Sequence, residues 1–183
     1  TFNLHLDHHD FTIRMDPLAS KVMIEDQATF RAKGASQPTF HVRFGPEWRV
    51  TKLSDANDKA VKYNQAAGTV SVVRPSGDRF TLKFTYEAVL DRADMDGKMR
   101  SDEMMLAGAC WWPSLARQAS TTKTTIISPP DWRSFGHGAR TKEAIENGMR
   151  VTVWDNQIPI SVLSAASGKY TIRLDKFGDK TFW

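Results

Sequence analysis

The sequence predicts an all-β protein, a twisted antiparallel two-sheet β-sandwich with little helix. Apolar and polar residues alternate with period two in segment after segment, which is typical of strands with one buried face. Turn-forming pairs of Gly, Pro, Asn and Asp separate these segments at short intervals. Amphipathic patterns of helix length are nearly absent. We therefore expect antiparallel strands to build the core.

The alternating segments follow one another along the chain. In the first, Phe11, Ile13 and Met15 share one side of the expected strand, while Thr12 and Arg14 share the other. Such a segment indicates a half-buried strand. On this basis we predict strands at residues 10–15, 21–31, 39–44, 48–53, 69–73, 80–87, 122–126, 151–153 and 172–174.

Two regions lack this alternation. Residues 141–147 carry the best helical pattern, but it covers only about two turns and would be marginal alone. Residues 91–103 are polar and rich in Asp, Met and Arg. We expect an exposed loop there. Because long loops without their own secondary structure are usually functional or disordered, this is where the chain could touch a partner.

The composition fits one soluble globular domain. A chain of 183 residues can bury a sizeable core, so we assign residues 1–183 to a single β-sandwich domain. Hydrophobic residues make up 40% and charged residues 25%, which is too apolar for a disordered chain. The net charge of +4 is scattered without a run of Lys or Arg, so we expect no nucleic-acid partner.

The sequence gives no sign of a membrane helix or of an internal disulfide. The apolar stretches stay far below the roughly 20 residues that a membrane helix needs, so we expect no membrane contact from this segment. The single cysteine, Cys110, cannot form an internal disulfide, which excludes a small disulfide scaffold. Because a sandwich of this size does not depend on disulfides, the cytoplasm and the periplasm or another extracytoplasmic space both stay open as its compartment.

Aromatic and proline landmarks recur in a fixed order. Cys110-Trp111-Trp112-Pro113 forms a tryptophan-rich corner, Pro129-Pro130-Asp131-Trp132 a turn, and Gly168-Lys169-Tyr170 a closing step. Together with the strand pattern, this order resembles the N-terminal β-domain of aminopeptidase N-like zinc metallopeptidases over nearly the whole chain. The resemblance implies a saddle-like form of the sandwich.

A missing motif shapes what the resemblance implies about activity. The family carries its zinc on a His-Glu-x-x-His helix, and this sequence contains no His-Glu dipeptide. The resemblance therefore implies a non-catalytic accessory domain without a cofactor of its own, with zinc in a catalytic domain outside this chain. It implies the peptidase domain of the same parent chain as the partner, an active site whose access this domain shapes, and a peptide as the substrate of the full enzyme.

Two details of the resemblance concern single positions. Relatives place a Gln or Glu shortly before the aromatic-proline corner, where it helps to hold the free amino group of the substrate. Counting back from the corner reaches Asp102-Glu103, which implies a substrate-binding role for Glu103. Many relatives also have Asp-Glu-Pro just after the corner, where this chain has Ser114-Leu115-Ala116-Arg117. That departure puts the chain in a divergent branch.

The N-terminal segment offers candidate metal ligands. His5, Asp7 and His9 carry the imidazole and carboxylate groups that zinc and other transition metals prefer. On an extended chain His5 and Asp7 would share a face, with His9 following. The competing interpretation is a polar lead-in whose histidines face solvent. It is favoured because chain ends seldom hold ligands in fixed positions, so we expect no metal site.

Two other classes of function stay open. The six tryptophans could form the flat apolar platform of a carbohydrate-binding β-sandwich module, which requires indoles facing solvent. A free-standing sandwich for protein interaction would instead present an uncovered apolar patch to its partner. The exposure of the tryptophan side chains separates the first of these from an accessory domain.

Overall fold

The structure is a computed structural model, which describes residues 4–33, 38–91, 97–108, 110–115, 118–173, 175–177 and 180–182. These residues contain no helix, and hence none with the length and hydrophobicity that a membrane span requires. The all-β prediction is confirmed. The strands are β1 (Leu4–Asp16), β2 (Lys21–Ala32), β3 (Thr39–Arg43), β4 (Arg49–Asp55), β5 (Tyr63–Ala66), β6 (Thr69–Val73), β7 (Arg79–Val89), β8 (Gly97–Met99), β9 (Glu103–Leu106), β10 (Ser120–Ser128), β11 (Arg133–Phe135), β12 (Ala139–Glu146), β13 (Met149–Ile160), β14 (Ala165–Gly168), β15 (Asp175–Phe177) and β16 (Lys180–Phe182).

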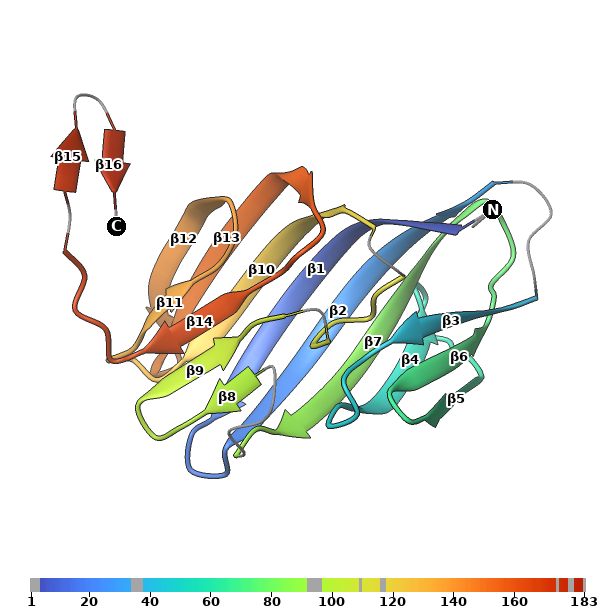
Figure 1. The fold of residues 1–183 in the computed structure, drawn as a ribbon, viewed down its shortest axis with the longest axis horizontal. Coiled ribbons are helices and arrows are strands. Elements are labelled where there is room, and N and C mark those ends of the chain that lie inside the picture. Colours follow the sequence, from blue (N-terminus) through green and yellow to red (C-terminus); the bar gives the residue numbers. More distant parts are fainter. Residues whose placement is uncertain are drawn as a thin grey trace.

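A seven-stranded sheet forms the backbone of the fold, with the strand order β12-β13-β10-β1-β2-β7-β4 (Figure 1). Its neighbours pair antiparallel except β1 and β10, which run parallel with Phe11 opposite Thr124. One inner row crosses six of the strands through directly opposite residues. It consists of Trp154, Thr124, Phe11, Asp26, Phe84 and Leu53.

Two smaller sheets cover that inner face and make the second layer of the sandwich (Figure 1). The four-stranded sheet β11-β14-β9-β8 lies over one half, where Met104 and Leu106 of β9 are fully buried in the core. The three-stranded sheet β3-β6-β5 lies over the other half, where Phe40 contacts Phe30 at 5.4 Å. Between them Trp111 packs on Phe11 at 5.0 Å. The aromatic residues that the alternation placed on one face thus form the contact between layers.

The segment at 141–147, which carries the best helical pattern of the sequence, forms a strand as far as residue 146. Residues 139–146 form β12, the last strand of the seven-stranded sheet, and pair with β13 through Glu143 opposite Thr152. Most side chains of β12 are exposed, because nothing pairs with its far edge in the described part of the chain. An edge strand open on both faces does not need period-two alternation, which explains the misleading pattern.

The predicted loop at 91–103 also contains strand structure. Residues 97–99 form β8, and Glu103 begins β9, which pairs with both β8 and β14. Residues 92–96 lie outside the described residues. The strand predicted at 172–174 is not formed at residues 172 and 173, and Leu174 lies outside the described residues.

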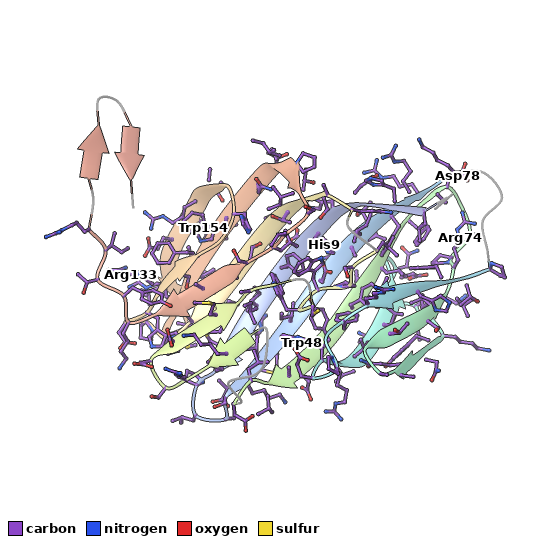
Figure 2. The ribbon with its side chains drawn as sticks, viewed as in Figure 1. His9, Trp48, Arg74, Asp78, Arg133 and Trp154 are labelled. Carbon is purple, nitrogen blue, oxygen red and sulfur yellow. The ribbon has the colours of Figure 1, made fainter. Side chains whose placement is uncertain are left out.

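One buried polar pair interrupts the apolar inner face. His9 of β1 and Asp26 of β2 are fully buried, and the imidazole Nδ1 lies 2.8 Å from the Asp26 carboxylate (Figure 2 labels His9). The imidazole stacks on Phe11 at 4.7 Å. Burial raises the pKa of Asp26 despite the neighbouring His9, because removal from water disfavours the carboxylate. The ionisation of Asp26 therefore makes the free energy of unfolding depend on pH.

We predict that Asp26→Asn flattens the pH dependence of the unfolding free energy. Asn keeps an oxygen within reach of His9 but cannot ionise. A carboxyl with a raised folded pKa favours the folded state while protonated, below its unfolded value near 3.8, and this contribution is lost as the pH rises through the folded pKa. Urea denaturation over a pH series measures it. The wild type should lose stability relative to the variant across that window, whereas the outward-facing Glu25→Gln on the same strand should track the wild type.

A second prediction compares two glycines with positive φ that flank β12. A Cβ on Gly138 (φ +86) would lie 2.1 Å from the backbone oxygen of Asp155, whereas one on Gly148 (φ +76) would meet nothing within 4 Å. Gly148→Ala should therefore cost about 1 kcal/mol of unfolding free energy through backbone strain. Gly138→Ala adds a backbone clash and should cost about 3 kcal/mol or more. Similar melting temperatures for the two variants would contradict this account.

Candidate functional site

The outward face of the four-stranded sheet holds Glu103, the residue implied to bind substrate. Glu103 begins β9, and its backbone carbonyl accepts a hydrogen bond of 2.7 Å from the backbone N–H of Arg100. Its carboxylate lies 2.6 Å from Lys98 Nζ and 3.6 Å from Arg100 Nη1. The side chain is 22% exposed. The turn between β8 and β9 thus places one carboxylate between two cations at the surface.

The closing step of the chain packs beside this carboxylate. Gly168 lies opposite Glu103 in the β9–β14 pair, and the Lys169 N–H donates a 2.9 Å hydrogen bond to the carbonyl of Asp102. A Cβ on Gly168 would lie 3.0 Å from the Tyr170 ring, so only glycine lets the ring approach this closely. Partial burial raises the pKa of Tyr170, and the carboxylates of Glu103 and Asp102 raise it further. The phenol therefore stays protonated and available as a donor at neutral pH.

An apolar hollow lies on the same sheet. It has a volume of about 240 Å³ and is lined by Met105 of β9, Phe135 of β11 and Ala166 of β14, with further residues between them. These three residues are directly opposite one another across the strands. Met105 is 39% exposed. The outward face therefore combines a charged end at Glu103 with an apolar end that could receive a hydrophobic side chain.

His137 borders the hollow from the loop after β11. Its Nε2 lies 2.9 Å from the backbone N–H of Ser164 and 3.1 Å from the Ser164 hydroxyl. Burial lowers the pKa of His137, so the imidazole is neutral at neutral pH and accepts the N–H bond. The role that fits this geometry is to fix the loop before β14, where Ser164 lines the hollow.

Only two of the three N-terminal metal candidates come together. His5 Nδ1 lies 2.8 Å from Asp7, and Asp7 also pairs with Arg31 at 2.9 Å, all at the surface. The expectation that His9 follows on the same face is wrong, because an irregularity between Leu6 and His8 shifts the register and turns His9 into the core. Within the described ranges no group of three or more His, Cys, Asp or Glu residues could hold a metal ion. The residues present do not fit a zinc site.

The five tryptophans in the described part of the chain do not form a sugar-binding platform. Trp48, Trp111, Trp112, Trp132 and Trp154 are all buried, and Trp183 lies outside the described residues. The Trp111 indole N–H donates a 3.0 Å hydrogen bond to the carbonyl of Leu163, which ties the aromatic corner to the segment before β14. The corner therefore serves the contact between the layers and leaves no row of described indoles facing solvent.

The sequence indicated Glu103 but missed its surroundings. Nothing in the polar segment 91–103 distinguished Lys98 and Arg100 from other surface cations, because their approach to Glu103 depends on the β8–β9 pairing. The hollow was missed as well, since Met105, Phe135 and Ala166 come from three separate segments. A signal for the Tyr170 contact was present in Gly168-Lys169-Tyr170, where glycine precedes an aromatic residue.

Comparisons with known proteins find relatives in structure only. No protein-family model matches the chain, and no curated protein sequence matches it. Among solved structures, an M1 zinc metallopeptidase from Deinococcus radiodurans bound to a Tyr-Ser-Ala substrate matches with a TM-score of 0.77 and 15% identity, over 98% of this chain and 46% of that one. A two-domain M1 zinc metallopeptidase bound to L-tryptophan matches with a TM-score of 0.77 and 15% identity, over 99% and 47%.

A larger protein gives the same result. Aminopeptidase A of Legionella pneumophila, in complex with aspartic acid, matches with a TM-score of 0.80 and 15% identity, over 96% of this chain and 22% of that one. The chain thus spans less than half the length of these structures. At such identity the likeness concerns the fold, and it agrees with the resemblance found in the sequence landmarks. This chain has the β-fold that forms part of M1 zinc metallopeptidases.

Proposed function

We propose that this chain is the N-terminal, non-catalytic β-domain of an aminopeptidase N-like zinc metallopeptidase, packing on the peptidase domain and shaping access to its active site. The observation that carries the proposal is the match over 99% of this chain to 47% of a two-domain metallopeptidase. Such coverage is what one domain of a larger enzyme would give. We assign residues 1–183 to that single domain.

The chemistry belongs to the domain outside this chain. Zinc supplies a Lewis acid and an activated water in such peptidases, whereas the described residues here offer no group of metal ligands. The contribution of this chain is binding. The outward face of the four-stranded sheet would lie toward the active site, where its apolar hollow and the carboxylate of Glu103 meet a peptide.

Glu103 is suited to hold the free amino group of a peptide. The α-amino group is largely protonated near neutral pH, and a carboxylate is its natural partner. Lys98 and Arg100 already flank the Glu103 carboxylate and hold it in place, and a bound ammonium would compete with Lys98 for its oxygens. This competition makes the role testable without unfolding the sheet.

The proposal predicts that the purified chain has no peptidase activity. With added zinc it should hydrolyse no aminoacyl-nitroanilide, because its described residues hold no group of metal ligands. The parent protein in the same assay is the positive control, and its sequence should continue into a His-Glu-x-x-His segment. Chelator-sensitive turnover by the chain alone would end the proposal, as would a parent that carries no such segment.

The proposed role of Glu103 can be tested in the parent enzyme. Glu103→Gln should lower kcat/KM for peptides by about 10-fold or more, as expected for the loss of one charge-assisted hydrogen bond. For a substrate whose amino group is acetylated, the same variant should leave kcat/KM unchanged. Lys98→Gln is the matched control, because it breaks the same ion pair but keeps the carboxylate. Equal losses in the two variants would mean that the pair is structural.

A further inference from the structure

An arginine cluster lies at the far edge of the sandwich from β4, where it adjoins the site described above through Arg133, which stands opposite Gly168. It consists of Arg133 of β11, Arg140 of β12 and Arg150 of β13, gathered around the carboxylate of Glu143 of β12. β11 and β12 are the last strands of their sheets, so the cluster bridges the two layers where the sandwich is open. Figure 2 labels Arg133 and Trp154 in this part of the molecule.

All three guanidinium groups reach the same carboxylate. Glu143 Oε1 lies 2.9 Å from Arg133 Nη1 and 2.6 Å from Arg150 Nη1, and Oε2 lies 2.6 Å from Arg140 Nη1. Arg133 and Arg150 each donate to Glu143 through a single Nη atom rather than the two-pronged arrangement that a guanidinium can offer. One carboxylate thus serves three cations.

Hydrogen bonds to the backbone hold the Arg150 side chain in place. Its Nε and Nη2 both donate to the carbonyl of Pro130, at 3.1 and 2.7 Å, which leaves Nη1 directed to Glu143. Its side chain is only 14% exposed, whereas that of Arg133 is 40% exposed and has Glu143 as its contact. The cluster therefore pairs one rigid, largely covered guanidinium with one that is partly open to solvent.

Two neighbouring ion pairs add no net charge to the cluster. Lys142 pairs with Glu146 at 2.5 Å, and Lys169 pairs with Asp131 at 3.4 Å, so these two pairs are neutral in themselves. Arg133 and Arg150 alone set two guanidinium groups against the one carboxylate of Glu143. Guanidinium groups held this close repel one another, and a second anion would relieve that repulsion.

Buried donors without partners lie on the same face. Thr152 stands directly opposite Glu143 and Trp154 opposite Arg140, so their side chains are cross-strand neighbours of the cluster. Both residues are more than nine-tenths buried, and Thr152 Oγ1 and Trp154 Nε1 have no hydrogen-bond partner. A hydroxyl and an indole N–H in this position add donor capacity that the protein itself does not use.

We propose that the arginine cluster is a binding site for an oxyanion, a carboxylate or phosphate group, with Glu143 as the resident carboxylate that the ligand joins or displaces. The proposal is independent of the peptidase assignment, since it rests on the charge excess, on the pre-set Arg150 and on the unused donors. A free anion and an acidic side chain of a protein partner offer the same group. The experiment separates these two sources.

The test is titration of the chain with inorganic phosphate at constant ionic strength and neutral pH, followed by NMR shifts of the β11 and β12 amides. The same titration with a tetraglutamate peptide forms the second arm. Saturable shifts centred on the cluster are expected in at least one arm. Saturation with phosphate identifies a free-anion site, and saturation with the peptide alone identifies a site for an acidic protein segment. No saturable shift in either arm overturns the proposal.

Three variants show whether the cluster is responsible. Arg133→Gln should weaken binding about 5-fold or more, because it removes the open guanidinium. Glu143→Gln should strengthen it by a similar factor, because the competing carboxylate is lost. Arg49→Gln is the matched control. Arg49 lies on β4, the opposite edge strand of the seven-stranded sheet, and pairs with Glu87, which also pairs with Lys21 at 2.8 Å. Equal weakening by Arg49→Gln and Arg133→Gln would reduce the effect to net charge and refute the site.

Discussion

Burial of one face of the seven-stranded sheet under the two smaller sheets is the interaction on which the structure depends. Phe11 lies in the middle of this face and contacts Trp111 from the aromatic corner, while Phe30 and Phe40 join the sheet to β3. Each buried aromatic side chain contributes about 2 to 3 kcal/mol through its removal from water. The four-stranded sheet is held in position by the same layer, and so is every feature on its outward face.

The outward face and the arginine cluster use charge in different ways. At Glu103 one carboxylate is flanked by two cations on a single hairpin, so the group is compensated and remains near the surface. At Glu143 one carboxylate receives three cations from three strands, so the cations come from separate segments of the chain. Electrostatics of this kind is weak between exposed groups but gains weight where side chains are partly covered. Both carboxylates are thus surrounded by cations, and they differ in whether one hairpin or three strands supply them.

Period two in the sequence was enough to predict the all-β class and most long strands, because residues such as Phe11, Ile13 and Met15 must all face one core. It failed at β12, where both faces are exposed and pairing with β13 alone decides the structure. It also failed to show that His9 and Asp26 are partners, since their contact depends on the shifted register of β1. Glu103 was accessible through family resemblance, whereas its cationic neighbours and the hollow arise only from tertiary contacts.

The parallel pairing of β1 with β10 has a consequence for how the chain reaches this state. His8 and Thr121 are 113 residues apart in sequence, yet their side chains hydrogen-bond at 2.7 Å. During synthesis β2 can pair with β1, and β7 with β2, long before β10 exists, so the other side of β1 keeps unpaired backbone groups until then. A chain that stops before residue 120 would keep that strand edge open and would be prone to self-association. The last third of the sequence, which supplies β10, thus pairs with the open edge of β1 and prevents self-association through it.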